Sequence, residues 1–186
     1  MAEIGAVRVP EASVESSASG VHWGAIVAGA LGAVGITLIL ITLGPGLGLV
    51  TVSPWSPYAH APTIFGRMAG TWLIITQWLS AALGGYLAGR LREKWVGVRT
   101  DEILFRDTAH GFLAWALGTL IVVLLLTFGA VLASTGTPVP QPSSPEAAEA
   151  ARKAAVAFSF FSALSLLIGA FIACVAGGLG GFHRDD

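Results

Sequence analysis

Hydrophobic residues occur along this chain in four long runs with almost no charged residue. The runs cover about residues 23–50, 65–91, 109–133 and 154–182, and shorter polar segments separate them. A helix needs about 20 apolar residues to cross roughly 30 Å of hydrocarbon. Only helices and closed barrels satisfy their backbone groups in lipid, and these runs lack the alternation of barrel strands. The pattern therefore predicts an all-α protein, an integral membrane four-helix bundle.

The runs divide the chain into a tail, one membrane domain and a short end segment. Residues 1–20 are polar and rich in small residues, which predicts a disordered tail, and residues 184–186 form a C-terminal tail. Residues 21–183 then form a single four-span domain. The first run exceeds the roughly 7 to 15 residues of a signal-peptide core, which favours an uncleaved span. Pro45 near its end predicts a kink or a stop there.

Basic residues are distributed unevenly among the connecting segments. The segment between the second and third runs contains Arg90, Arg92, Lys94, Arg99 and Arg106. The other two connections, residues 51–64 and 134–150, contain no Lys or Arg. Because cytoplasmic loops of membrane proteins gather Lys and Arg, both termini and the basic segment are expected in the cytoplasm. The sequence thus predicts a multi-pass membrane protein with both termini on the cytoplasmic side.

The two halves of the chain match each other weakly. The segment 28–40, "AGALGAVGITLIL", resembles 114–126, "AWALGTLIVVLLL". Two helical hairpins in tandem, a 2+2 repeat, would produce this similarity, because a two-span unit re-enters the membrane in the same orientation. Low-complexity composition would also produce it, so both explanations stay open.

Small residues recur at every fourth position on three of the expected helices. The ladders are Gly24, Ala28 and Gly32; Ala81, Gly85 and Gly89; and Gly169, Ala173, Gly177 and Gly181. Such ladders let helix backbones approach closely in lipid. The spacing predicts tight helix packing, and it leaves open whether the facing helix belongs to the same chain or to another.

Ionisable residues are concentrated in "TDEILFRDTAHG", residues 100–111. Glu102 and Arg106 stand four apart, as do Arg106 and His110, so each pair shares one helix neighbourhood. One interpretation is an interfacial helix start with local ion pairs, in which Thr100 acts as the cap. The alternative is functional: Asp107, three residues before His110, would orient that histidine as a proton carrier or ligand.

The repeat places further polar residues at comparable span ends. The candidate polar functional cluster is Asp107, His110, Arg106, His22, Arg90 and His183. Three histidines at one end would suit a haem or a metal ion, although none of them has the tight spacing of a ligand pair. The single cysteine, Cys174, permits neither an internal disulfide nor a Cys-based metal motif. Ordinary span-end side chains explain the histidines without any cofactor.

The expected spans are poor in residues that carry chemistry. Gln77 is the one strongly polar residue deep in a run, and Thr76 precedes it. Gln77 would form an interhelical hydrogen bond or line a pore. No phosphate loop, nucleophile elbow or HExxH motif is present, so no enzyme activity is expected. Only 11% of residues are charged and the net charge is −1, so the sequence does not predict the basic surface that binds nucleic acid.

Four stretches carry a resemblance to a known family. "HWGAIVAGALGA", "VSPWS", "GGYLAGRLR" and "DEILFRDTAHGFLAWALG" resemble small multi-span membrane proteins of bacteria, chiefly alphaproteobacteria. The resemblance covers most of residues 21 to 130 and implies a bacterial inner-membrane protein. Some members carry the loose label "PhnA-like", which implies phosphonate chemistry or a zinc ribbon. This chain has no cysteine pair, so no activity and no catalytic residue is carried over.

The sequence therefore favours a non-enzymatic membrane protein, an accessory or scaffolding subunit that contacts lipid and either other subunits or itself through small-residue faces. The first alternative is a homo-oligomeric channel or transporter for a small solute or ion, built around Gln77 and Thr76. The second is a haem- or metal-binding membrane subunit that uses His22, His110 and His183.

Overall fold

The chain folds into four helices and no strand within residues 20–51, 62–93, 99–134 and 142–185, which the computed structural model describes. The helices are α1 (Trp23–Thr51), α2 (Pro62–Arg90), α3 (Thr100–Ser134) and α4 (Pro145–Asp185). Three of them, α1, α3 and α4, are long and apolar enough to cross a membrane. The prediction of an all-α membrane protein is therefore confirmed at this level, while nearly all of the tail 1–20 lies outside the described residues.

The helix bounds agree with the sequence prediction in one place and differ from it in two. α3 begins at Thr100, ahead of the apolar run that starts near residue 109, as the interpretation of residues 100–111 as a helix start predicted. α4 begins at Pro145 and not near residue 154, and the Ser144 hydroxyl accepts a hydrogen bond from the Ala147 amide at 3.2 Å as its cap. The predicted stop at Pro45 is wrong, because α1 continues as a helix to Thr51.

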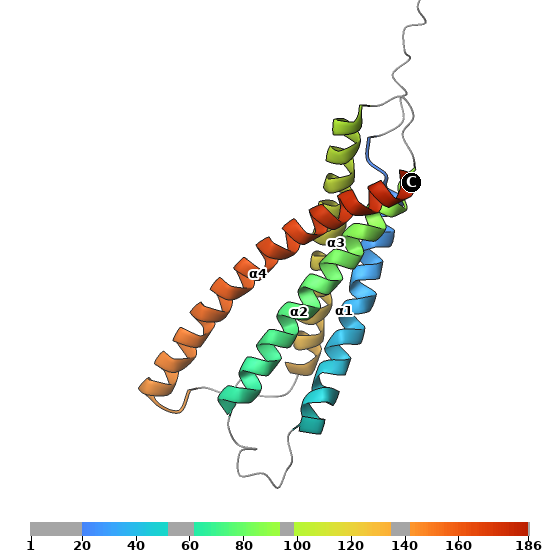
Figure 1. The fold of residues 1–186 in the computed structure, drawn as a ribbon. Coiled ribbons are helices and arrows are strands. Elements are labelled where there is room, and N and C mark those ends of the chain that lie inside the picture. Colours follow the sequence, from blue (N-terminus) through green and yellow to red (C-terminus); the bar gives the residue numbers. More distant parts are fainter. Residues whose placement is uncertain (1–19, 52–61, 94–98, 135–141, 186) are drawn as a thin grey trace, which may run out of the picture.

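The helices run alternately up and down, so that α1 and α3 begin at the end where α2 and α4 finish (Figure 1). We call this end, where Arg92, Asp107 and Arg184 lie, the charged end. α2 contacts all three other helices, and its most extensive contact is with α4. The described parts of α1 and α4 do not contact each other. α2 and α3 therefore form the centre of the bundle.

Small residues explain why α2, α3 and α4 approach so closely near the charged end. A methyl group on Gly85 would overlap the carbonyl oxygen of Ala173, and one on Gly89 would overlap that of Gly177. A methyl group on Gly111 of α3 would also overlap the Ala173 carbonyl. Backbone packs on backbone here, as small-residue ladders allow. The ladders of α2 and α4 thus face each other within one chain.

The predicted ladder of α1 is less involved in packing than its neighbouring face. Gly24 is exposed and would have nothing within 4 Å of an added methyl group, Ala28 is half-buried, and Gly32 faces the side chain of Leu87. The closest approach of α1 to α2 occurs instead at Gly29, whose missing side chain leaves room for the Gly84 carbonyl oxygen. The four-residue spacing alone did not show whether the face with Gly24, Ala28 and Gly32 or the face with Gly29 packs closely on α2.

The opposite end of α3 and α4 has little packing. Every residue from Val123 to Ser134 in α3 and from Ala148 to Phe161 in α4 is exposed. We call these two segments, 123–134 and 148–161, the open halves; α4 diverges from the other helices there (Figure 1). By contrast, α1 and α2 stay joined beyond the bundle centre, since the Trp72 indole donates a hydrogen bond to the Leu40 carbonyl at 2.8 Å.

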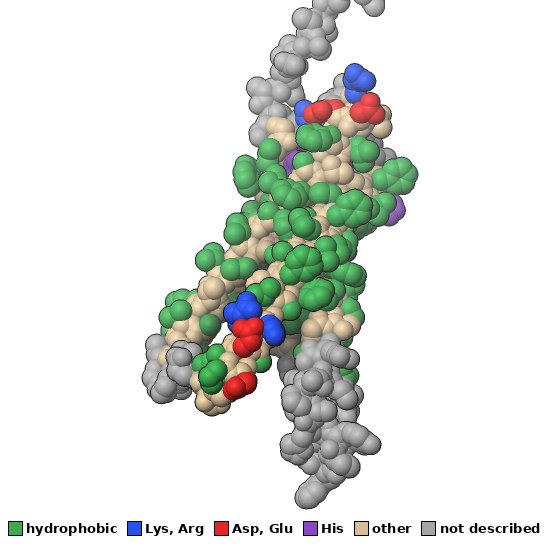
Figure 2. Space-filling view, turned by 90° about the vertical axis from the view of Figure 1, so that its left-hand side faces the viewer, with side chains coloured by type: hydrophobic (Ala, Val, Ile, Leu, Met, Phe, Trp, Pro, Cys, Tyr) green, Lys and Arg blue, Asp and Glu red, His purple; other side chains and the backbone are tan. Residues whose placement is uncertain are grey.

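The surface carries apolar side chains along most of its length. Figure 2 shows one face on which apolar residues cover the middle, while Lys, Arg, Asp and Glu gather toward the ends. Large exposed apolar residues include Leu38, Leu79, Leu124, Phe158, Leu167 and Phe171. Such a surface suits lipid and would be a liability in water.

Candidate functional site

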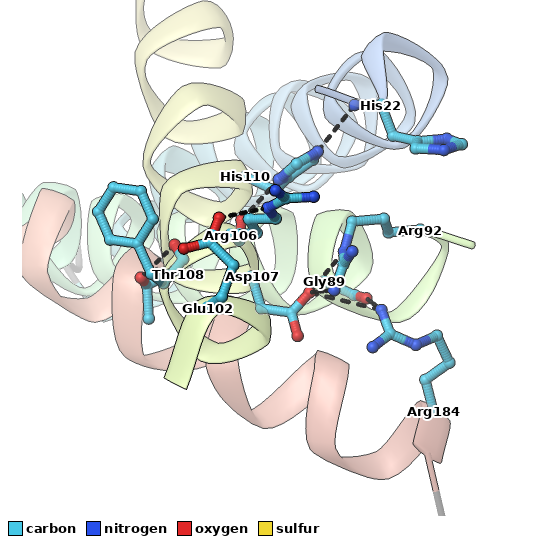
Figure 3. Close-up of polar contacts among 10 residues, drawn as sticks. His22, Gly89, Arg92, Glu102, Arg106, Asp107, Thr108, His110 and Arg184 are labelled. Carbon is cyan, nitrogen blue, oxygen red and sulfur yellow. Dashed lines mark hydrogen bonds and ion pairs between the residues drawn. The ribbon is translucent and has the colours of Figure 1, made fainter. Parts of the chain in front are cut away.

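Asp107 forms the centre of a buried ion-pair network at the charged end. It lies in α3 and is 2% exposed, and Arg92, just after α2, is also 2% exposed. Arg92 Nε donates to Asp107 Oδ1 at 2.7 Å, and Arg184 Nη1 near the end of α4 lies 3.4 Å from the same oxygen. Figure 3 shows the carboxylate between the two guanidinium groups. One acid therefore ties together the ends of three helices.

Glycines make room for this network. A methyl group on Gly181 would overlap the Asp107 carboxylate, so the carboxylate rests on bare backbone of α4. Arg184 Nη1 also donates to the Gly89 carbonyl at 3.2 Å, which links α4 to α2 a second time. Removing one partner of a buried ion pair typically costs about 3–5 kcal/mol, because the remaining charge stays buried. The network and the ladders thus support the same helix contacts.

Sequence reasoning missed both arginines of the network, although a signal for Arg184 was present. Arg92 follows Gly89 by three residues and Arg184 follows Gly181 by three, so each continues a small-residue ladder by about one helical turn. The α4 ladder lies against the helix that carries Asp107, because methyl groups on Gly177 and Gly181 would overlap atoms of Asp107. Extending the α4 ladder face beyond Gly181 leads to Arg184, whereas Arg92 lies beyond the end of α2, whose ladder faces α4.

His110 joins the start of α1 to α3. Its Nε2 accepts a hydrogen bond from the backbone N–H of His22 at 2.8 Å, and its Nδ1 lies 2.6 Å from the Arg106 carbonyl oxygen. A backbone N–H can only donate and a carbonyl can only accept, so the ring is neutral with its proton on Nδ1. The ring is almost fully buried. In this arrangement each ring nitrogen forms a hydrogen bond with a backbone group.

The structure brings together only part of the predicted polar cluster. Asp107 is turned toward Arg92 and Arg184 and does not orient His110, whose partners are backbone groups. The expected pair of Glu102 and Arg106 forms, with Arg106 Nε 2.6 Å from Glu102 Oε1.

The remaining members of the predicted cluster lie at the surface. Arg90 is exposed, and so is His183, whose ring meets the Tyr86 ring edge-on at 6.0 Å between centroids. Among the described residues, no group of three or more His, Cys, Asp and Glu side chains is placed to hold a metal ion. The geometry therefore adds no support to the haem or metal alternative.

A cavity of about 120 Å³ lies in the middle of the bundle. Residues of α1, α2 and α3 line most of it, and α4 contributes Leu166. Its polar lining side chains are Thr37, Gln77, Ser80, Trp115 and Thr119. Thr37 and Ser80 are already joined, with their hydroxyl oxygens 2.7 Å apart. Gln77, predicted as interhelical or pore-lining, thus borders a cavity at the meeting point of the helices.

Two polar atoms near the cavity are buried and have no hydrogen-bond partner within the described part of the chain, the Thr76 hydroxyl and the Trp115 indole nitrogen. A buried donor without a partner costs about 1–3 kcal/mol. Gln77 Nε2 and Trp115 Nε1 both lie 3.1 Å from the point where a side chain on Gly169 would begin. Gln77 and Trp115 therefore both lie beside the backbone of α4 at this glycine.

No protein-family model, curated protein or solved structure matches this chain. The class of the protein therefore follows from its own geometry. It is an all-helical protein with three helices that can cross a membrane, a charged end held by buried ion pairs and a cavity at the bundle centre.

Proposed function

We propose that this protein is a non-enzymatic subunit of a membrane assembly, and that the open halves of α3 and α4 contact its partner chains. The observation that carries the proposal is the exposure of every residue in 123–134 and 148–161. A helix in a stable bundle normally buries one stripe against its neighbours, whereas these segments bury none within the chain. Another chain that supplies the missing contacts would complete the bundle.

The proposal places the partner surface differently from the sequence prediction. The ladders of α2 and α4 were candidates for contact with other chains, but they are occupied by each other inside this chain. Their buried glycines are therefore not available to a partner. Large apolar side chains such as Phe158, Phe160 and Phe161 are exposed on α4 instead, and these would provide the contact area.

The proposal includes four spans, with α2 as the fourth. α2 has 29 residues, enough to cross about 30 Å of hydrocarbon at 1.5 Å per residue, and it lies between three helices, which tolerates its polar and glycine residues. The basic connection between α2 and α3 supports a cytoplasmic charged end and cytoplasmic termini in a bacterial inner membrane. The same proposal includes a tandem origin of the two helical hairpins. It also includes membership of the alphaproteobacterial family that the sequence resembles.

The experiment is native mass spectrometry of the protein extracted from its own membrane in mild detergent. We expect a particle with other subunits at fixed stoichiometry. Phe161→Ala in an open half should release them, and the matched change Phe182→Ala, an equally exposed phenylalanine near the charged end, should not. A particle that contains only one copy of the chain would refute the proposal.

A ring of identical chains would instead favour the channel alternative. The cavity beside Gln77 is the observation that supports this alternative. A Gln77→Leu variant that conducts as well as the unchanged protein would remove it.

A further inference from the structure

We propose that His110 is a pH-sensitive switch, whose neutral ring holds the start of α1 on α3 and whose doubly protonated ring releases it. The inference concerns the charged end and is independent of the proposed subunit role. It rests on the two hydrogen bonds of the ring, the place of His22 at the start of α1, and the charged groups around the ring.

The hydrogen bonds of His110 fit only one protonation state of the ring. Nδ1 donates to the Arg106 carbonyl four residues earlier in α3, and Nε2 accepts from the N–H of His22, 88 residues away, at 2.8 Å. A second proton would have to bind at Nε2, where it would meet the hydrogen of the His22 amide. Two donors do not form a hydrogen bond with each other. The second proton and the contact with His22 therefore exclude each other.

His22 is the residue at which the hydrogen bonds of α1 begin. Its carbonyl accepts from the amides of Ala25 and Ile26, which makes His22 the N-cap residue of the helix. The His22 ring takes no part in the contact with His110. Figure 3 shows this ring turned away from His110, and its Nε2 lies 3.7 Å from Glu93 Oε2. Loss of the backbone contact would therefore separate the first turn of α1 from α3.

The surroundings of the His110 ring are unfavourable for a second positive charge. The charged and titratable groups near it belong to the segments that meet at the charged end: His22, Arg92, Glu93, Glu102, Arg106, Asp107 and Arg184. Asp107 would attract the charge, but it is already paired with Arg92 and Arg184. The start of α1 is also the positive end of a helix dipole. Since the ring is only 1% exposed, a doubly protonated ring would reach water only by leaving this position.

The direction of the response follows from which state binds the extra proton. The held ring has no free nitrogen for it, whereas an imidazole in water takes it up near about pH 6.5. Acid therefore favours release. The equilibrium constant for release should rise about 10-fold between pH 7.5 and pH 5.5. The switch would respond to acidification on the side of the membrane that the charged end faces.

The test is NMR of the full chain in lipid nanodiscs with nitrogen-15 in histidine only, so that one sample reports the His110 ring and the His22 amide. Protection of this amide from hydrogen exchange is measured relative to an unstructured peptide at the same pH. We expect the protection to fall about 10-fold between pH 7.5 and pH 5.5, as the His110 ring gains its second proton.

Three variants assign the response to the His110 ring. His110→Phe should leave the His22 amide weakly protected at both pH values. His22→Gln keeps the backbone N–H at position 22 and should keep the response. The matched control is His183→Gln, at an exposed histidine of the same end, which should also keep it. Helical circular dichroism checks that each variant folds.

Two results from the unchanged protein would overturn the proposal without any variant. One is equal protection of the His22 amide at both pH values. The other is a loss of protection while the His110 ring keeps a single proton, because another group would then cause the release. A response that is lost in His22→Gln and kept in His110→Phe would overturn it as well, since the titrating ring would be that of His22.

Discussion

The charged end and the open halves of this protein are built from the same helices but hold together by different means. At the charged end, glycines let α2, α3 and α4 meet backbone to backbone, and Asp107 links two arginines from neighbouring segments. In the open halves, every described residue of α3 and α4 is exposed, including large apolar side chains. In lipid, apolar character alone does not bring helices together, because lipid tails are equally apolar. Close packing and polar contacts decide which segments associate.

The largest effect should come from the centre of the ion-pair network. Asp107→Asn keeps the side-chain size but leaves two guanidinium groups without their shared carboxylate. We expect the free energy of unfolding to fall by about 3–5 kcal/mol, measured by circular dichroism during titration with a denaturing detergent. Glu102→Gln, which removes a more exposed ion pair of α3, should cost about 0.3–0.5 kcal/mol. Equal losses in the two variants would contradict the distinction between buried and exposed pairs.

The next effect should come from the backbone contacts. Gly89→Ala places a methyl group against the Gly177 carbonyl, which cannot move without shifting a helix. The expected loss is about 1–3 kcal/mol in the same unfolding titration. Gly35→Ala is the matched control, because nothing lies within 4 Å of that position and alanine favours a helix more than glycine does. A Gly89→Ala protein as stable as the control would argue against close packing of α2 on α4.

A smaller effect should follow from removing the link between α1 and α3. His110→Phe preserves the ring shape but leaves the His22 N–H without its acceptor, which we expect to cost about 1 kcal/mol. Nitrogen-15 NMR of the unchanged protein should report a neutral His110 ring with its proton on Nδ1. A spectrum with the proton on Nε2 would rule out the hydrogen bond from His22.

The smallest effect should occur in the open halves. Leu126→Ala removes a large side chain that is exposed in the folded chain, so the isolated protein should lose less than about 0.5 kcal/mol. Within the intact membrane assembly, the same change should release partner chains, as proposed for Phe161. A large loss in the isolated chain would mean that α3 packs more closely than the structure indicates.

Much of this architecture could be predicted from the sequence because membrane helices are encoded by local composition. The apolar runs located all four helices, and the pair Glu102 and Arg106 followed from spacing within one helix. The helical start of α3 at Thr100 followed from its charged-residue spacing, whereas the polar first turn of α4 was missed, since a search for apolar runs does not detect polar turns that extend a helix beyond them.

The site was harder to predict because it depends on which helix faces which. Spacing within α3 suggested that Asp107 orients His110. In the folded chain, Asp107 instead forms ion pairs with Arg92 and Arg184, which come from other segments. The cavity beside Gln77 likewise exists only after several helices have packed. Glycine ladders were the one sequence signal of these contacts, and they identified the α2 and α4 faces but not the closest face of α1.

The difference between a tightly held charged end and separated open halves is the central claim, and spin-label distances between α3 and α4 test it most directly. In a Cys174→Ala background, one protein carries labels at Leu104 and Leu179, and another at Leu126 and Phe158; all four positions are exposed. Double electron–electron resonance in nanodiscs should give a short, narrow distance for the first pair and a longer, broader one for the second. Equally short and narrow distances for both pairs would contradict the account.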